Sequence, residues 1–312
     1  MAYSLRQLSY AVAVTECGSI TDAAKKIGIS QPAISVALKD LEAEFGISIF
    51  LRQPAHRITL TPAGKRFIEH VRRLLEYIDE FESEACGLGH SLNGSMKAGC
   101  FLPTAPFIMP LILSAMEERY PGITVHFDED NLRELNDGIK SGQIEVALMY
   151  DMHPDKQIQF ETLVEAKPYV LLSARDPLAK QSSVQLEDLR EKEMVLFELP
   201  ITQDYFQNIV SAGGRQPNIG YRTKSYEMLR SLVASRGGFA ILIMNPHTDR
   251  AYDGSLLVSR PIRDPLPSAR YGLAMAKDYS PRRIVQAFIE VCRMTLNDEG
   301  AAAKFFLSQP GT

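Results

Sequence analysis

Short polar side chains gather at the start of one segment, residues 28–46, whose sequence is GISQPAISVALKDLEAEFG. The Gln31 amide can form a paired hydrogen bond with an adenine edge, and the Ser35 hydroxyl can bond a base or a phosphate. The Ala33 methyl group can contact the methyl group of thymine. Side chains this short let a helix approach the bases, so the segment could read sequence in the major groove of DNA. The candidate DNA-reading residues are Ser30, Gln31, Pro32, Ala33, Ser35, Val36 and Lys39.

The periodicity of the same segment predicts a helix that could present these side chains. Its apolar residues form one stripe with spacings of four, three and four, and they are Ile34, Leu38, Leu41 and Phe45. Ser30 is a typical N-cap, and Pro32 is tolerated in the first helical turn. An ordinary surface helix would explain this segment alone equally well, so the flanking segments must decide between the two interpretations.

The residues before this helix predict two shorter helices. The first has an apolar stripe that stops at Gly18 and comprises Leu5, Leu8 and Val12. The second begins at Ser19, three residues before Asp22, which is the spacing of a capping box, and it stops at Gly28. The second of these helices is joined by a glycine-containing turn to the helix that follows Ser30. Residues 19–38 therefore predict a helix-turn-helix.

The segment after the helix-turn-helix predicts a β-hairpin wing. Residues 53–56 read Gln-Pro-Ala-His, which is turn-like, and residues 57–61 alternate as a strand does. Cationic side chains near the tip could contact backbone phosphates, which adds affinity without reading sequence. Solvated surface is the alternative for each of these side chains. The DNA-binding candidates of this segment are Arg52, His56, Arg57 and Thr61.

A long helix with one narrow apolar seam is predicted from Pro62 to Leu88, and with the hinge it makes up residues 62–90. Its seam alternates by four and three, and its core members are Phe67, Val71, Leu74, Ile78 and Phe81. Such a seam needs a partner, which could be a second copy of the chain or the protein's own body. We favour a second copy, because a paired reader fits a two-fold DNA site. Glycines at 87, 89 and 94 then predict a hinge.

Residues after the hinge alternate between strand-like and helical patterns, which predicts parallel strands with crossover helices. Ligands of such sheets lie beyond the carboxyl ends of strands, near helix N-termini. Hydroxyls and free amides there would suit a carboxylate or another small anion. Helix capping is the alternative role for the Ser and Thr residues. The effector-binding candidates are Cys100, Pro103, Thr104, Asn131, Tyr150, Pro200, Ile201, Thr202 and Ser225.

Composition is that of a globular protein of two or three domains: 312 residues, 45% apolar and 23% charged. Residues 1–66 hold eight Lys and Arg against five Asp and Glu, whereas the whole chain has a net charge of −4. A positive head on an acidic body is consistent with nucleic-acid binding. No apolar run reaches the roughly 18–20 residues of a membrane helix, and no signal peptide is evident, so we expect a cytoplasmic protein without membrane contact.

No catalytic motif with a recognised spacing occurs, so we do not expect this protein to be an enzyme. The four cysteines and six histidines show no metal-ligand spacing, and neither a metal nor a cofactor is expected. Two alternatives stay open. One is a redox-responsive regulator that uses Cys100, with Cys86 as a partner. The other is a solute-binding or enzymatic body that carries a residual DNA-binding head.

Residues 18–64 resemble the winged helix-turn-helix of the LysR-type transcriptional regulators. The resemblance is carried by "AA", "SQPA-S", "LE--FG---F-R" and "LTPAG", which occur in this order and spacing. The family often has an arginine where this chain has Val36, so the resemblance does not imply direct reading of a guanine at that position. The strand and helix order of the body also resembles the family's effector domain, which is similar to type 2 periplasmic binding proteins.

The resemblance implies a multidomain α+β and α/β fold in five parts. They are a winged helix-turn-helix (1–61), a coiled-coil linker helix and hinge (62–90), effector lobe 1 (91–165 and 266–296), effector lobe 2 (166–265) and a tail (297–312) that we expect to be mobile. It implies a bacterial regulator whose dimers bind an interrupted inverted repeat in double-stranded DNA, pair into a homotetramer and contact RNA polymerase. A small organic effector, anionic or aromatic, would bind between the lobes.

Overall fold

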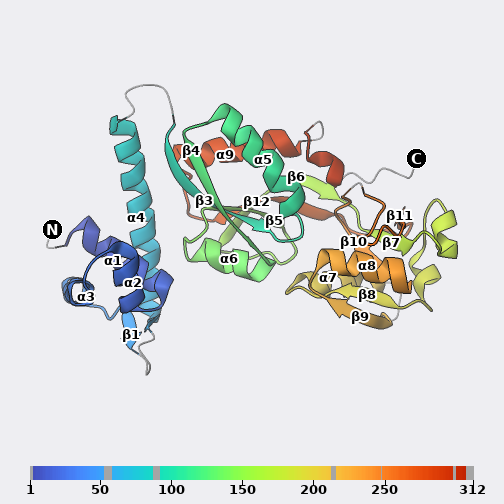
Figure 1. Ribbon diagram of the computed structural model, residues 1–312, viewed down its shortest axis with the longest axis horizontal. Coiled ribbons are helices and arrows are strands. Elements are labelled where there is room, and N and C mark those ends of the chain that lie inside the picture. The colour runs from blue at the N-terminus through green and yellow to red at the C-terminus, as the bar shows by residue number, and fades with distance from the viewer. Residues whose placement is uncertain are drawn as a thin grey trace. The chain divides into compact units, whose positions relative to one another are not determined.

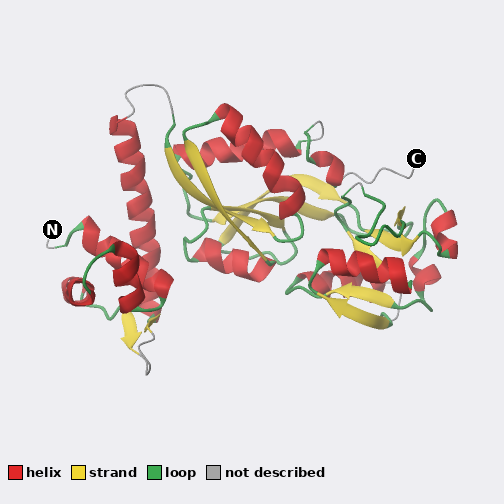
Figure 2. Cartoon of the chain, viewed as in Figure 1, coloured by secondary structure: helices red, strands yellow, loops and turns green. Residues whose placement is uncertain are grey.

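The computed structural model describes residues 3–52, 58–86, 92–211, 216–246, 248–297 and 300–306. The chain forms two compact units (Figure 1). The N-terminal unit holds the first four helices and a small hairpin, and the C-terminal unit holds two five-stranded sheets with their helices (Figure 2). The expected multidomain fold class is therefore confirmed, and the two units are described separately.

Three helices with glycine stops build most of the N-terminal unit. They are α1 (Leu5–Cys17), α2 (Ile20–Ile27) and α3 (Gln31–Phe45). Each is followed by a glycine in the left-handed conformation, at Gly18, Gly28 and Gly46. The Ser19 hydroxyl accepts a hydrogen bond from the Asp22 amide at 3.3 Å and caps α2 as expected. The predicted helix-turn-helix is present.

The core of this unit differs in detail from the expected stripes. The buried face of α1 comprises Leu8, Ala11 and Val14, whereas Leu5 is exposed. The reason is that α2, α3 and the next helix all pack against α1, so small side chains such as Ala11 are needed where the backbones approach. On α3 the buried residues are Ile34, Ala37, Leu38 and Leu41. The Phe45 ring packs at the edge of the core, 4.8 Å from the Phe67 ring.

The hairpin and the linker helix follow. Strands β1 (Phe50–Arg52) and β2 (Ile58–Leu60) pair antiparallel, which is the predicted wing. Helix α4 (Pro62–Cys86) begins after Thr61 and runs for 25 residues. A Cβ atom on Gly64 would lie 2.0 Å from the Ile49 carbonyl oxygen, so only glycine allows α4 to start this close to the hairpin.

The first sheet of the C-terminal unit has the order β4-β3-β5-β12-β6. Its strands are β3 (Gly94–Phe101), β4 (Ile123–Asp130), β5 (Val146–Tyr150), β6 (Ile158–Ala166) and β12 (Ala269–Ala276). Helices α5 (Ala105–Arg119) and α9 (Arg283–Leu296) cover one face, and α6 (Leu132–Lys140) covers the other (Figure 1). We call this sheet with its helices the first lobe.

The second sheet has the order β11-β7-β10-β8-β9. Its strands are β7 (Tyr169–Ser173), β8 (Met194–Phe197), β9 (Ile219–Thr223), β10 (Phe239–Leu242) and β11 (Leu257–Pro261). Helices α7 (Thr202–Ser211) and α8 (Tyr226–Arg236) and the short 3-10 helices η2 (Pro177–Lys180) and η3 (Leu186–Leu189) complete the second lobe. The chain crosses between the lobes after β6 and again after β11.

The expectation of parallel strands is only half right. Strand β3 pairs parallel with β5, and β8 pairs parallel with β9 and β10. Strand β12 pairs antiparallel with β5 and β6, and β7 pairs antiparallel with β10 and β11. The antiparallel pairs involve the strands next to the two crossings, because a strand that enters a sheet from the other lobe has no crossover helix to turn it round.

The expectation of a mobile tail is wrong for the part that the structure describes. After α9, residues 300–306 fold back and contain the 3-10 helix η4 (Ala303–Phe305). Ala302 and Phe306 are buried within the C-terminal unit. Residues 298–299 and 307–312 lie outside the described part of the chain.

Candidate functional site

The candidate reading surface is the exposed start of α3. Gln31, Pro32 and Ala33 are exposed, as is Ser30 before them, and Val36 is 58% exposed. Ser30 is the N-cap residue, but its side chain makes no capping hydrogen bond. Further along, Ser35 is half-buried and Lys39 is exposed. Because Ile34, Leu38 and Leu41 are buried beneath them, the apolar stripe fixes this polar face toward the outside.

The remaining DNA-binding candidates lie on the hairpin and at the start of α4. The backbone of Arg52 ends β1, where it pairs with Ile58. His56 and Arg57 belong to the tip, which lies outside the described residues. Thr61 does not suit a surface contact, because it is buried, its Oγ1 donates to the Ser48 carbonyl at 2.6 Å, and it accepts from the Gly64 amide at 2.8 Å. The Thr61 side chain caps the N-terminus of α4.

The predicted seam of α4 divides into a buried and an exposed part. Phe67 and Val71 pack into the core of the N-terminal unit together with Ile68, so they are not free to face a partner helix. Beyond them, Leu74 is 40% exposed and Phe81 is 69% exposed, with Ile78 half-buried between them. Tyr77, which the seam did not include, is 54% exposed and lies one turn from both. The exposed apolar face therefore comprises Leu74, Tyr77 and Phe81.

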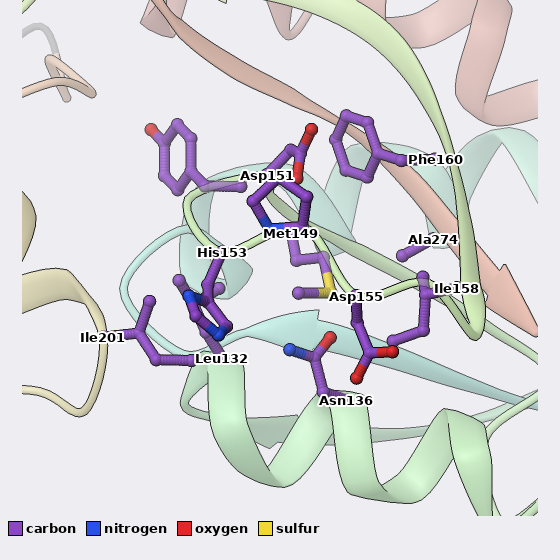
Figure 3. Close-up of a pocket in the computed structure, with 12 residues that line it drawn as sticks. Leu132, Asn136, Met149, Asp151, His153, Asp155, Ile158, Phe160, Ile201 and Ala274 are labelled. Atoms are coloured by element: carbon purple, nitrogen blue, oxygen red, sulfur yellow. The ribbon is translucent and has the colours of Figure 1, made fainter.

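Three adjoining cavities lie between the two lobes of the C-terminal unit, and they share lining residues. The roomiest has a volume of about 610 Å³ and lies between Arg133 and His153 of the first lobe and Asp204, Tyr205 and Asn208 of the second. The second, of about 70 Å³, shares His153 and Ile201 with it. In Figure 3, Ile201 reaches this second cavity from a separate ribbon, opposite residues of the first lobe such as Asn136 and Asp155.

The third cavity is small, at about 20 Å³, and its walls are apolar and aromatic. The predicted residues Pro103, Thr104, Tyr150 and Thr202 line it. Tyr150 comes from the end of β5 and Thr202 from the start of α7, so the cavity joins the two lobes. Phe101, Phe197, Phe206 and Tyr226 supply the rings around it.

Two of the hydroxyls at this cavity have no hydrogen-bond partner in the protein. They belong to Tyr150 and Thr202, whose side chains are buried, and the half-buried Tyr205 hydroxyl of the adjoining cavity is also unpartnered. Burial raises the pKa of Tyr205 to about 12 and raises the pKa of Tyr150 as well, so both are neutral groups that can donate a hydrogen bond. Buried polar groups without a partner are costly, and a ligand or an ordered water that bonds them would remove that cost.

Cys100 lies behind this cavity, within a hydrogen-bonded cluster. The Thr104 hydroxyl donates to the Phe101 carbonyl at 2.8 Å and lies 2.9 Å from the Tyr271 hydroxyl. The Cys100 sulfur lies 3.8 Å from each of these two hydroxyls. Complete burial raises the pKa of Cys100 to about 12, so the group is a protonated thiol at neutral pH. It lines none of the three cavities, which removes it from the candidate ligand contacts.

Three other predicted residues have local structural roles or lie away from the three cavities. The Asn131 side chain accepts from the amides of Arg133 and Glu134 and caps α6. The Ser225 hydroxyl accepts from the Met228 amide at 3.2 Å and caps α8. Pro200 precedes the cavity residue Ile201 but lines none of the three cavities. Capping was the alternative reading for Ser225, and its contact fits that role.

Ile201 has an unusual backbone conformation with a φ of 71°. A β-branched residue at positive φ costs about 1–3 kcal/mol, and such residues are typical of ligand sites. Sequence reasoning placed Ile201 correctly at a helix start, but no sequence signal predicted its strain. His153, Asp204 and Tyr205 were not predicted, because they follow loops or lie inside a helix rather than directly after a strand.

Two kinds of site are not found among the residues that the structure describes. No group of three or more His, Cys, Asp or Glu side chains is arranged to hold a metal ion. No helix in the described ranges is both long enough and apolar enough to cross a membrane.

Comparison with known proteins identifies both units. Residues 5–65 match the family described as bacterial regulatory helix-turn-helix protein, lysR family, and residues 89–297 match the LysR substrate binding domain. This chain is similar to the crystal structure of HinK, a LysR family transcriptional regulator from Pseudomonas aeruginosa, with 32% sequence identity. The match covers 95% of this chain and 99% of the HinK chain, with a TM-score of 0.63.

Two curated relatives agree with this assignment. A probable nitrogen assimilation transcriptional activator of Synechococcus elongatus is 26% identical over 313 residues, which span 95% of this chain and 96% of that protein. The uncharacterized HTH-type transcriptional regulator YvbU of Bacillus subtilis is 27% identical, over 62% of this chain and 65% of YvbU. By their names, both relatives are regulators of transcription. The resemblance seen in the sequence is confirmed: the chain belongs to the LysR family of transcriptional regulators, with an N-terminal DNA-binding domain and a C-terminal effector-binding domain.

Proposed function

We propose that a dimer of this protein inserts two copies of α3 into successive major grooves of an interrupted inverted repeat. The exposed first turns of α3 support this, because they present short side chains above a buried stripe. Gln31 would pair with adenine, and Ser35 would bond a base or a phosphate. Lys39 and the wing would bind phosphates. The two half-sites would lie roughly 34 Å apart, which is one turn of DNA.

The dimer contact is proposed on the exposed apolar face of α4, Leu74, Tyr77 and Phe81. An exposed apolar stripe on a 25-residue helix is costly in water and is relieved by a second copy of the same helix. Two such dimers would join through their effector-binding domains into a tetramer, and the bound assembly would contact RNA polymerase. The chromosome of a bacterium lies in the cytoplasm, so the protein would act there.

A gel-shift titration of the full chain against DNA from its own upstream region tests the reading helix. Gln31→Ala and Ser35→Ala should each weaken binding to the preferred site by about 1–3 kcal/mol and reduce its preference over random DNA. Lys39→Ala should weaken binding to both DNAs alike and reduce the salt dependence. Glu44→Ala, an exposed change in the last turn of α3, is the matched control. Specific binding that ignores the first two changes would overturn the assignment.

The effector is proposed to be a small organic compound that binds between the two lobes. The unpartnered hydroxyls of Tyr150 and Thr202 carry this part of the proposal, because a bound polar group would satisfy both. The aromatic rings around them suit an aromatic or otherwise apolar body. The α7 N-terminus beside Thr202 favours a negative charge, so a small acid fits as well. No resident cofactor or metal is part of the proposal.

Regulation follows if the effector prefers one arrangement of the lobes. The third cavity is too small to hold more than a water-sized group, whereas the adjoining cavity of about 610 Å³ could hold a metabolite. An effector that draws the hydroxyls of both lobes onto itself must therefore change the angle between the lobes. It shifts the population only by the difference between its affinities for the two arrangements.

A thermal-shift screen of the full chain with small acids and aromatic compounds tests the effector site. A ligand present at 100 times its dissociation constant should stabilise the chain by about 2.7 kcal/mol. Thr202→Val and Tyr150→Phe should abolish most of that shift, because they remove the two unpartnered hydroxyls. Tyr252→Phe, at an exposed tyrosine away from the cavities, is the matched control. A ligand shift that both cavity variants retain would place the effector elsewhere.

A further inference from the structure

Residues 300–306, which we call the tail segment, follow the match to the LysR substrate binding domain, which ends at residue 297, and are anchored to the end of α9. The Gly300 amide donates to the Asn297 carbonyl at 2.7 Å, and the Ala302 amide donates to the Thr295 carbonyl at 3.0 Å. A Cβ atom on Gly300 would lie 2.3 Å from the Thr295 carbonyl oxygen, so this close return of the chain requires glycine.

The two phenylalanines of the tail segment pack on the first lobe. The Phe306 ring is stacked on the Tyr271 ring at 4.7 Å and lies 6.4 Å from the Tyr150 ring. The Phe306 side chain is only 1% exposed, so it is fully buried. The Phe305 ring lies 5.7 Å from Phe107 on α5. Burial of such large apolar side chains favours the docked position of the tail segment.

The same segment is bound to the second lobe. The Phe305 carbonyl accepts a hydrogen bond of 2.7 Å from the Asn245 amide, just after β10. The preceding residue, Met244, is fixed within the second lobe, because its carbonyl accepts from the hydroxyls of Tyr169 at 2.9 Å and Tyr226 at 3.0 Å. The Tyr226 ring in turn lies 6.3 Å from the Phe107 ring of the first lobe. The tail segment therefore joins both lobes through different contacts.

We propose that the tail segment is a clasp that holds the two lobes in one arrangement. It acts beside the third cavity, because Tyr150 and Met244 line that cavity and also belong to the contacts of the clasp. A change in the angle between the lobes separates the Asn245 amide from the Phe306 site, so the clasp must release one of them. The clasp stands on its own contacts, whereas its release by an effector rests on the proposed function.

Hydrogen exchange of the full chain, without effector or DNA, tests the clasp. The Asn245 amide of the intact protein should be protected, and a chain ended after Asn297 should lose protection there and over the first turn of α5 by at least about tenfold. A peptide of residues 298–312, added in large excess, should restore that protection. The same peptide with Phe306→Ala should not restore it, and a peptide with Ala301→Ser, a change at an exposed position, should.

The outcomes separate a clasp from an inert end of the chain. Rapid exchange at Asn245 in the intact protein would overturn the proposal, and this measurement needs no variant. Equal protection in the intact and shortened chains would also overturn it. So would a loss of protection throughout β5 and β12 in the shortened chain, since that is general unfolding of the first lobe. None of these results bears on whether an effector binds or DNA is read, so the proposed function would be unaffected.

Discussion

The hydroxyl of Tyr271 lies 2.9 Å from Oγ1 of Thr104, and both side chains are buried. The two groups differ in what each would lose if the other were removed. Thr104 would still donate to the Phe101 carbonyl, whereas Tyr271 would keep only the weak contact with the Cys100 sulfur at 3.8 Å. The cluster ties the start of α5 to β12 directly behind the third cavity.

This asymmetry predicts the stability of three variants. Thr104→Val should lower the free energy of unfolding by about 1–3 kcal/mol, because it leaves a buried phenol without a good partner. Tyr271→Phe should cost less, and Tyr271→Phe added to Thr104→Val should cost little more. Urea unfolding followed by circular dichroism measures all three. Strictly additive costs would show that the two hydroxyls do not interact.

A buried ion pair fixes the first lobe at its other end. Arg282 donates to Glu145 from Nε at 2.7 Å and from Nη2 at 2.9 Å, and both side chains are buried. Glu145→Ala should lower the free energy of unfolding by about 3–5 kcal/mol, because the guanidinium is left uncompensated. The control is Glu161→Ala at the more exposed pair with Arg293, which should change it by less than about 1 kcal/mol. Similar losses at both sites would contradict this reasoning.

The protonated state of Cys100 predicts its chemistry and its pH dependence. Burial raises its pKa from about 9 to about 12, so the folded protein should resist alkylation and peroxide oxidation at Cys100 at pH 8, whereas half-buried Cys17 should react first. Because the folded-state pKa is the higher one, the stability that this thiol adds is complete below pH 9. It is lost as the pH rises toward 12.

Mass spectrometry of peroxide-treated protein checks this expectation directly. Cys100 should remain unmodified, and Cys100→Ser should bind DNA with the same affinity before and after treatment. Modification of Cys100 in the folded chain, together with altered DNA binding, would favour the redox-responsive alternative instead. The side chain of Cys86 lies outside the described residues, so its modification is scored in the same spectrum.

The exposed apolar face of α4 predicts how the dimer can be broken. Phe81→Asp and Leu74→Asp place a charge in the proposed helix-helix contact and should shift the chain toward monomers at micromolar concentration. Sedimentation velocity measures the shift, with His70→Asn at an exposed position of the same helix as the control. A dimer that survives both charges would mean that the copies associate through another surface.

The elements of the N-terminal unit and the exposed face of α3 could be predicted because they depend on local signals. A stripe from Ile34 to Leu41 and glycine stops at positions 18, 28 and 46 fix the helix-turn-helix without long-range information. The same reasoning assigned the whole seam of α4 to a partner helix, whereas the packed structure shows that Val71 joins a core that already contains Leu8 and Ile68.

The candidate effector site was harder to predict, because its parts are distant in the sequence. Thr104, Tyr150 and Thr202 were found by the rule that ligands lie beyond strand ends, but Tyr205 and His153 come together with them only through the crossing of two lobes. The tail segment gave no periodic signal at all. Its order depends on a glycine that allows a close return and on two aromatic sites formed by other parts of the chain.

Selection of bound sequences from a random DNA library by the full chain tests the central claim most directly. The claim is that two copies of α3 read DNA together. It predicts enrichment of an interrupted inverted repeat with half-sites about 10 base pairs apart, and a Gln31→Ala chain should lose preference at the same position of both half-sites. Enrichment of a motif without two-fold symmetry, or of no motif, would contradict the claim.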